Sequence, residues 1–294
     1  MSGEHGGDDR PLAPGLYLVA TPIGNLEDIT LRALRVLRSV DRIACEDTRQ
    51  TQKLLNHFNI QTPTVSYHMH NEGPRTEELT VELKHGARIA VVSDAGTPGI
   101  ADPGGQIASA AIAAGIDVFP VPGANAAISG LIASGLPTDR FLFHGFLPAK
   151  AGQRKTSLEE LARGDTTHVF YEAPHRILDT LADVGAVFGA SQHVVVAREL
   201  TKLHEEFLRG AVSELRSQLA ARSAVRGEIV LMLAPSTVTS PDEKGKTSLA
   251  SEVAALMKSD GISEMDALKR IARERGISKS EAYRELQREQ KRLR

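Results

Sequence analysis

Three short loops rich in glycine and proline contain the residue types that could hold a ligand. They read TPIGN at residues 21–25, SDAGTPGIADPGG at residues 93–105 and PGANA at residues 122–126. Glycine allows positive φ and a close approach of the backbone to a ligand, and proline fixes the bends between. A tight turn would explain any one loop by itself. Three such loops on one rim of a sheet predict a binding pocket.

Two further segments mix acidic and basic side chains. They read EDTR at residues 46–49 and RELTK at residues 198–202. In each, a carboxylate could accept a proton while a neighbouring cation holds a phosphate or lowers a pKa. A rim of salt bridges that only positions the loops explains the same residues equally well. The catalytic candidates are Asp47 and Arg49 first, then Glu199 and Lys202.

No metal site is expected. His68 and His70 alternate as metal ligands would, but no third ligand follows at a suitable spacing, which favours a solvated strand end. Cys45 lies at the end of an apolar run and is interpreted as a small core residue rather than a nucleophile.

From residue 15 onward, short apolar runs alternate with segments of helical period, the pattern of a parallel α/β fold. Thr30 is expected to cap a helix whose apolar face includes Leu31, Leu34 and Leu37. Strands are expected at residues 16–20, 42–44, 64–66, 88–93 and 117–121, and helices at residues 48–57, 75–84, 105–114 and 125–133. Ligands lie beyond the carboxyl ends of parallel strands, so the pocket is predicted at that edge of the sheet.

A second set of apolar runs predicts a second α/β domain. Its strands are expected at residues 141–146, 168–171, 194–197 and 229–233. The predicted organisation is a disordered tail at 1–14, α/β domains at 15–137 and 138–234, a linker at 235–247, and a small helical appendage at 248–294. Three short amphipathic helices are expected in the appendage, and its break ERGISKSEAY resembles the turn of a helix-turn-helix.

Composition excludes several classes of protein. The 294 residues include 35 Lys and Arg against 37 Asp and Glu, so a uniformly basic coat is excluded. A single Cys excludes a disulfide framework. The longest apolar run, 229–234, is far shorter than the roughly 18 residues of a membrane span, and residues 1–15 lack the apolar core of a signal peptide. A cytoplasmic location without membrane association is expected.

Charge gathers at the end of the chain. Residues 265–294 contain ten basic side chains and five acidic ones. This excess fits a solvated helix face and an RNA-contacting segment equally well.

The expected first strand is not followed by the glycine motif G-x-G-x-x-G. The absence of this motif argues against a site for a nicotinamide dinucleotide and against the common nucleoside-binding methyltransferase fold.

Six long segments resemble one family. They read LYLVATPIGNLEDITLRAL, EDTRQTQKLL, SDAGTPGIADPG, VPGANAAISGLIASGLPTDRFLFHGFLP, YEAPHRI and ARELTKLHEEF. In this order they are similar to the bacterial ribosomal small-subunit RNA (cytidine-2′-O)-methyltransferases, a branch of the tetrapyrrole methylase superfamily. The resemblance implies two α/β domains with S-adenosyl-L-methionine bound in a cleft between them, and a homodimer.

The resemblance also implies which residues surround the cofactor. From the first domain these are Ile23, Gly24, Asp94, Gly96, Thr97, Asn125 and Ala126. Tyr171 and Glu172 would close the cleft from the second domain, and Gly227 and Glu228 would lie near the adenosine by weaker analogy. Asp94 could bind the cofactor's ammonium group, or could instead cap its own loop.

The expected reaction is 2′-O-methylation of a cytidine ribose in the decoding region of 16S ribosomal RNA, on free RNA or on the assembled small subunit. Methyl transfer requires the acceptor oxygen in line with the methyl carbon and a group that takes the hydroxyl proton. Two alternatives remain open. The same fold could methylate a small corrin-like molecule or a protein side chain, or the chain could be a nonenzymatic RNA-binding assembly factor.

Overall fold

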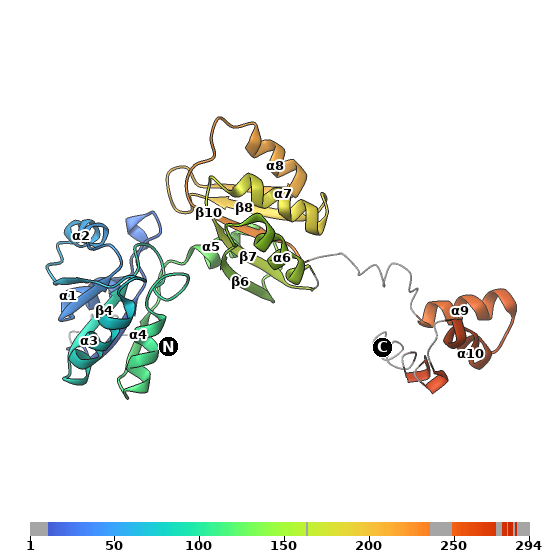
Figure 1. The fold of residues 1–294 in the computed structure, drawn as a ribbon, viewed down its shortest axis with the longest axis horizontal. Coiled ribbons are helices and arrows are strands. Elements are labelled where there is room, and N and C mark those ends of the chain that lie inside the picture. Colours follow the sequence, from blue (N-terminus) through green and yellow to red (C-terminus); the bar gives the residue numbers. More distant parts are fainter. Residues whose placement is uncertain are drawn as a thin grey trace, which may run out of the picture. The chain divides into compact units, whose positions relative to one another are not determined.

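A computed structural model describes residues 11–162, 164–235, 249–274, 278–280, 282–284 and 286. The chain divides into two compact units, Met1–Pro235 and Ser236–Arg294. The first unit contains two five-stranded sheets (Figure 1). Residues 1–10 of the predicted tail, and all but the first residue of the predicted linker 235–247, lie outside the described residues.

The first sheet is parallel throughout, with strand order β3-β2-β4-β1-β5. This confirms the predicted parallel α/β pattern for the first half of the chain. The strands are β1 (Gly15–Val19), β2 (Arg42–Cys45), β3 (Thr64–Ser66), β4 (Arg88–Val92) and β5 (Val118–Val121). The connecting helices are the 3-10 turn η1 (Leu26–Asp28), α1 (Leu31–Ser39), α2 (Thr48–His57), α3 (Glu72–Lys84) and α4 (Gly105–Ala113).

Helices cover both faces of this sheet. One face packs against α1 and α2 through a cluster that includes Val36, Leu37 and Leu55, and the other packs against α3 and α4. Thr30 caps α1 as predicted, since its hydroxyl accepts a hydrogen bond from Ala33 N at 3.0 Å. The predicted apolar face of α1 was partly wrong, because Leu31 is 86% exposed and Ala33 and Val36 are buried instead.

The second sheet is mixed, with strand order β6-β7-β10-β8-β9. Its strands are β6 (Phe141–Phe146), β7 (Thr167–Glu172), β8 (His193–Arg198), β9 (Glu206–Ala211) and β10 (Ile229–Leu233). Only β6 and β7 are parallel; β10 is antiparallel to β7 and β8, and β9 is antiparallel to β8. The expectation of a parallel sheet was therefore wrong for the second domain. Alternating strand and helix patterns in the sequence occur in both parallel and mixed sheets, so they do not determine the strand directions.

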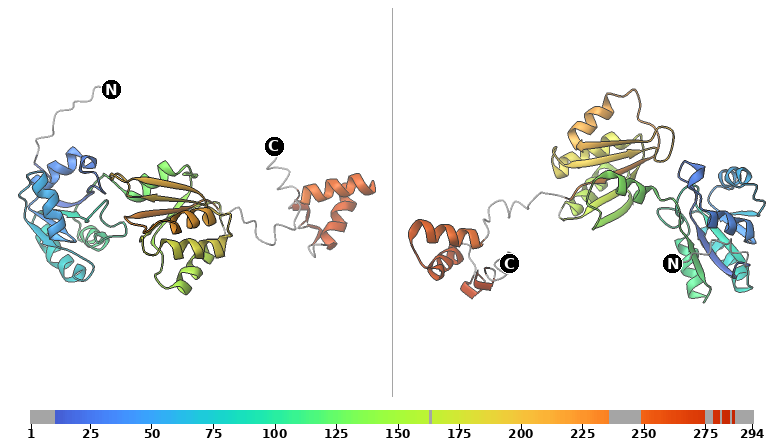
Figure 2. Two further views of the ribbon diagram at one scale, coloured as in Figure 1. Left: turned by 90° about the horizontal axis from the view of Figure 1, so that it is seen from above. Right: turned by 180° about the vertical axis from the view of Figure 1, so that it is seen from behind.

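Four helices pack on the second sheet. They are α5 (Ala126–Ser134), α6 (Ala151–Leu161), α7 (Ile177–Phe188) and α8 (Val212–Ala220). The last three share one apolar cluster with the sheet, whereas α5 packs on the opposite face through Ala127 and Leu131. Figures 1 and 2 show α5 beside this second sheet, although α5 lies within residues 15–137, the predicted first domain. The chain thus crosses between the domains immediately before α5.

The second unit contains α9 (Leu249–Asp260) and α10 (Glu264–Glu274). Both helices contribute to one apolar cluster, which also includes Ala282 and Leu286 beyond α10. Residues 279–280, 282–284 and 286 are helical, in the region of the third predicted helix. The predicted helix-turn-helix break at 274–283 lies partly outside the described residues.

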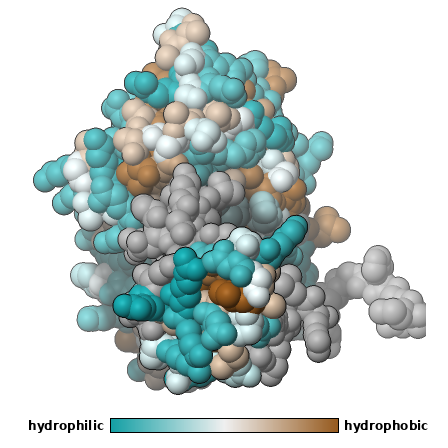
Figure 3. Space-filling view, turned by 90° about the vertical axis from the view of Figure 1, so that its right-hand side faces the viewer, coloured by the Kyte–Doolittle hydropathy of each residue, from teal (hydrophilic) through white to brown (hydrophobic). Residues whose placement is uncertain are grey.

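No helix in the described part of the chain is long and apolar enough to cross a membrane. On the face seen in Figure 3, hydrophobic residues form small groups between hydrophilic ones.

Candidate active site

The loops after β1 and β4 leave a crevice at the carboxyl edge of the first sheet. These strands are neighbours, but β1 leads to α1 on one face and β4 leads to α4 on the other. A crevice between diverging connections is where α/β sheets bind ligands. Two backbone hydrogen bonds join the loops: Thr21 N donates to Gly96 O at 2.8 Å, and Gly96 N donates to Thr21 O at 3.1 Å.

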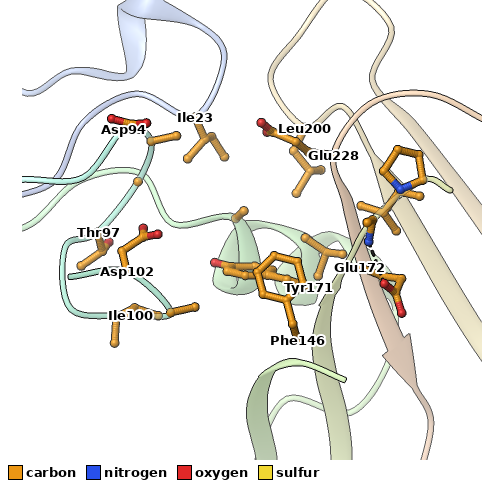
Figure 4. A pocket seen from close by; sticks show the side chains of 18 residues that line it. Ile23, Asp94, Thr97, Ile100, Asp102, Phe146, Tyr171, Glu172, Leu200 and Glu228 are labelled. Carbon is orange, nitrogen blue, oxygen red and sulfur yellow. Dashed lines mark hydrogen bonds between the residues drawn. The ribbon is translucent and has the colours of Figure 1, made fainter. Parts of the chain in front are cut away.

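A cavity of about 370 Å³ opens between these loops and the second sheet (Figure 4). Several of its lining residues come from the first domain: Ile23, Asp94, Ala95, Gly96, Thr97, Ile100, Ala101 and Asp102. The remainder come from α5 and the second sheet with its loops: Ala126, Phe146, Tyr171, Glu172, Ala173, Pro174, Leu200, Glu228, Ile229 and Val230. Of the eleven cofactor residues expected from the sequence, this cavity brings together Ile23, Asp94, Gly96, Thr97, Ala126, Tyr171, Glu172 and Glu228.

Gly96 is required at its position for two reasons. Its φ of +81° is one that side chains with a Cβ rarely adopt. A Cβ built there would also lie 3.3 Å from Ile23 Cγ2, on the cavity wall. The loop therefore brings its backbone close to whatever fills the cavity.

Asn125 does not line the cavity but positions a residue that does. Its side chain caps α5 by accepting a hydrogen bond from Ile128 N at 3.1 Å, and its Nδ2 donates to Thr97 Oγ1 at 3.3 Å. Thr97 Oγ1 in turn donates to Ala124 O at 3.1 Å. Asn125 thus joins the loops after β4 and β5.

Tyr171 and Glu172 contribute in different ways. Burial raises the pKa of Tyr171, and a hydrogen bond with the Ala127 backbone opposes this shift, so the ring presents a neutral hydroxyl. The Glu172 carboxylate is fully buried and accepts hydrogen bonds from Ala173 N at 2.7 Å and Thr180 Oγ1 at 2.6 Å. Glu172 therefore shapes the loop after β7, and its charge is already bound.

The segment after β8 forms a network of ion pairs rather than an open site. Lys202 Nζ lies 3.0 Å from Glu199 Oε1 and 3.1 Å from Glu228 Oε2. Glu199 Oε1 also accepts a hydrogen bond from Glu228 N at 3.0 Å, and the Lys202 contact lowers the pKa of Glu199. Glu199 does not line the cavity, whereas Lys202 lines a neighbouring hollow of about 560 Å³ beside α2.

Gly24 and Gly227 lie against this network. A Cβ at Gly24 would collide with Lys202, and one at Gly227 would collide with Glu199. Gly24 lines the neighbouring hollow and Gly227 lines neither of the two. Both glycines allow these side chains to pack closely against the backbone. From the sequence alone, this structural role could not be distinguished from contact with a ligand.

Asp47 and Arg49 bind each other. Asp47 caps α2, and Arg49 Nη2 lies 3.0 Å from Asp47 Oδ2 while its side chain is 87% exposed. The Arg49 contact lowers the pKa of Asp47. Neither residue lines the cavity; Asp47 N donates a hydrogen bond to Asp94 Oδ1 at 3.1 Å. The structure thus places Asp47 behind the loop after β4.

Asp102 was not among the site residues expected from the sequence. It stands eight residues after Asp94, in the same loop, and lines the cavity. Burial, with Glu46 and Asp94 nearby, raises the pKa of Asp102 to about 6. The signal that could have identified Asp102 from the sequence is its acidic side chain within the glycine- and proline-rich loop at residues 93–105. Among the described residues, no group of three or more His, Cys, Asp or Glu side chains is arranged to hold a metal ion.

Comparisons with known proteins agree on the family. Residues 15–216 match Tetrapyrrole (Corrin/Porphyrin) Methylases. The chain is 48% identical over 274 residues to ribosomal RNA small subunit methyltransferase I of Halalkalibacterium halodurans, covering 91% of this chain and 93% of that one. The protein of the same name from Synechocystis is 46% identical over 268 residues, covering 91% and 95%.

Solved structures show the same fold. Uroporphyrin-III-C-methyltransferase of Thermus thermophilus has a TM-score of 0.53 and 21% identity, covering 75% of this chain and 94% of that one. A structure of such an enzyme from the same organism, complexed with S-adenyl homocysteine, has a TM-score of 0.52 and 19% identity, covering 75% and 97%. Diphthine synthase has a TM-score of 0.57 and 14% identity, covering 74% and 89%. With two α/β domains, a cavity between them and these relatives, the chain belongs to the tetrapyrrole methylase family.

Proposed function

We propose that the protein transfers a methyl group from S-adenosyl-L-methionine to the ribose 2′-hydroxyl of a cytidine in the decoding region of small-subunit ribosomal RNA. The methyltransferase and its ribosomal RNA substrate are supported by relatives at 46–48% identity that cover more than nine tenths of both chains. The choice of a cytidine 2′-hydroxyl in the decoding region rests only on the resemblance of the sequence motifs to the bacterial ribosomal small-subunit RNA (cytidine-2′-O)-methyltransferases.

The cavity fits this cofactor chemically. Ile23, Leu200 and Val230 offer apolar walls for an adenosine, and Asp94 offers negative charge for the ammonium group. The volume of about 370 Å³ lies within the range of small-molecule sites. When bound, the cofactor supplies an electrophilic methyl group. The eight predicted residues on this cavity are proposed as cofactor contacts; Gly24, Asn125 and Gly227 are proposed to support them.

The acceptor RNA would approach from the side of α2. The hollow beside the cavity shares Ile23, Asp94, Ala95 and Glu228 with it and adds Lys53 and Lys202 as cations. Arg49, exposed at the start of α2, lies in the same region. We propose that Arg49 and Lys202 contact RNA phosphates, whereas the ion pairs of Asp47 and Glu199 give those residues positioning roles.

A homodimer in the bacterial cytoplasm, acting on free RNA or the assembled small subunit, completes the proposal. The edge strand β6 exposes Phe141 and Leu142 by 37% and 50%, which offers apolar surface for a second copy. Light scattering should show a dimer at micromolar concentration. A monomer there would remove the dimer from the proposal.

The experiment is to map ribose methylation in ribosomal RNA from a strain lacking the protein, then restore it with purified protein and labelled cofactor. Restoration at one cytidine ribose supports the proposal, and methyl transfer only to a small molecule or protein overturns it. Calorimetry with S-adenosylmethionine tests the alternative of a nonenzymatic assembly factor. Such a factor has no reason to bind the cofactor, so an absence of binding would favour it. Truncation before Ser248 should preserve cofactor affinity but weaken RNA binding and methylation, and the RNA affinity of the truncated chain should fall less steeply with salt than that of the full chain.

A further inference from the structure

Asp102 is held in the cavity by a strained turn. The preceding residue, Ala101, has φ of +63°, which costs a residue with a Cβ about 1 kcal/mol or more. The turn is closed by Gly99 N, which donates to Pro103 O at 3.1 Å. Figure 4 shows the Asp102 carboxylate directed into the space between the two domains, with the hydroxyl of Tyr171 directed toward it from the opposite wall. Such strain is retained where the side chain must point in one direction.

The other carboxylates that line the cavity are already engaged. Glu172 is bound by Ala173 N and Thr180, and Glu228 pairs with Lys202. Asp94 accepts a hydrogen bond from Asp47 N and is proposed above to bind the cofactor's ammonium group. In the part of the chain that the structure describes, Asp102 forms no ion pair with a cation. Asp102 is therefore the lining carboxylate available to take a proton.

We propose that Asp102 is the catalytic proton acceptor of the methyl transfer. This inference rests on the proposed ribose methylation. As the 2′-oxygen lone pair forms the new bond to the methyl carbon, the carbon–sulfur electron pair stays on sulfur. The hydroxyl O–H bond breaks, its electron pair stays on oxygen, and the proton moves to an Asp102 carboxylate oxygen. The products are a methyl ether, a neutral thioether and a protonated Asp102, so charge and atoms balance.

The surroundings of Asp102 suit this step. Burial is the main cause that raises its pKa to about 6; Glu46 after β2 and Asp94 after β4 add to the shift, and a hydrogen bond with Ser93 opposes it. Tyr171 of β7 faces it with a neutral hydroxyl. A general base is most effective when its pKa lies near the operating pH, since it is then deprotonated yet still basic. Glu46 acts through Asp102 and is a positioning residue.

The first test measures stability and needs no substrate. The pKa of Asp102 in the folded chain lies above its ordinary value of 3.8, so the folded state binds the proton more tightly. The charged residue therefore destabilises the fold as the pH rises from about 4 through about 6. Asp102→Asn should melt at a higher temperature than the wild type at pH 7.5 and at the same temperature at pH 4. A lower melting temperature at pH 7.5 would overturn the proposal.

The second test measures single-turnover methylation of small subunits from a strain lacking the protein. Asp102→Asn should lower the rate roughly 100-fold or more, while S-adenosylhomocysteine affinity by calorimetry stays within about threefold. Asp41→Asn is the matched control, because Asp41 pairs with Arg88 outside the cavity and should leave the rate unchanged. A rate within threefold of wild type, or an affinity loss as large as the rate loss, would overturn the assignment.

The pH profile separates Asp102 from a structural residue. The wild-type rate should rise with pH through about 6, and this acidic limb should be absent from Asp102→Asn. Glu46→Gln should move the limb to lower pH, because removing a nearby negative charge lowers the pKa of Asp102. An unmoved limb in Glu46→Gln would count against the proposal. If the wild type produces no ribose methylation, the proposed function fails; if it does and Asp102→Asn retains the limb, only this inference fails.

Discussion

The loop after β4 and the segment after β8 both contain acidic residues and both reach the same cavity. They differ in whether their carboxylates form ion pairs. Both contain residues other than glycine at positive φ: Ala101 in the first, Glu199 and Thr201 in the second. Asp94 and Asp102 in the first loop line the cavity. In the second segment, Glu199 pairs with Lys202 and the adjoining Glu206 pairs with Arg198 and Arg222.

The difference shows that a cation partner, rather than the residue type, separates the two roles. Burial near other acids raises the pKa of Asp102 to about 6, whereas Arg222 and Arg198 lower the pKa of Glu206 to about 2. A paired carboxylate keeps its charge and holds the backbone in place. An unpaired one in a cavity can bind a cation or take a proton. We expect substitutions of Gly96 and Asp94 in the first loop to change cofactor binding, substitution of Asp102 to change the rate of methyl transfer, and substitutions in the second segment to change stability.

The largest effect on binding is expected from Gly96→Val. The new side chain would need the rarely adopted φ of +81° and would contact Ile23 on the cavity wall. Affinity for S-adenosylmethionine should fall more than about 100-fold, a loss of roughly 3 kcal/mol. Calorimetry measures the affinity, and circular dichroism should show an intact fold. Unchanged affinity would place the cofactor elsewhere.

Asp94→Ala is expected to reduce cofactor affinity about 10- to 100-fold. It removes a negative charge that we propose binds the cofactor's ammonium group, and such hydrogen bonds contribute about 1.5–3 kcal/mol. The same variant frees Asp47 N, so Asp94→Asn, which keeps an acceptor for that donor, separates the two roles. Equal affinity in the wild type and both variants would mean that Asp94 only caps its loop.

Glu206→Gln should lower stability at neutral pH by about 1 kcal/mol without changing cofactor affinity. Because the pKa of Glu206 is lowered from 4.5 to about 2, its contribution is present above pH 4.5 and is lost as the pH falls toward 2. Melting temperatures of wild type and variant should therefore converge in acid. Glu159→Gln, an exposed position on α6, serves as the control. A constant difference across that range would refute the ion-pair explanation.

The smallest effect on the cavity is expected from Glu199→Gln. The glutamine can still accept a hydrogen bond from Glu228 N, so we expect less than a threefold change in cofactor affinity and a stability loss below about 1 kcal/mol. Calorimetry and thermal unfolding measure the two quantities. A tenfold loss of affinity would remove the distinction between the two segments.

Much of the local structure could be predicted from the sequence. Helix α2 and strands β3, β6 and β10 begin and end at the predicted residues, and Thr30 caps α1 as expected. Strand β9 was missed because Glu206–Ala211 lacks a clear alternation of apolar and polar residues. The family resemblance also implied eight of the residues that line the cavity. The helices, strands and caps are local features, because glycine, proline and capping residues act through their own backbone.

What the sequence determined was therefore the set of loops, the strands that precede them and the family to which they belong. The tertiary structure decided how α5 packs, how the second sheet is paired and which acids face the cavity. Glu199 pairs with the loop at Glu228, and Asp102 lies across the cavity from Tyr171. Such partners are far apart along the chain, and a carboxylate's pKa depends on the charges and burial that folding brings to it.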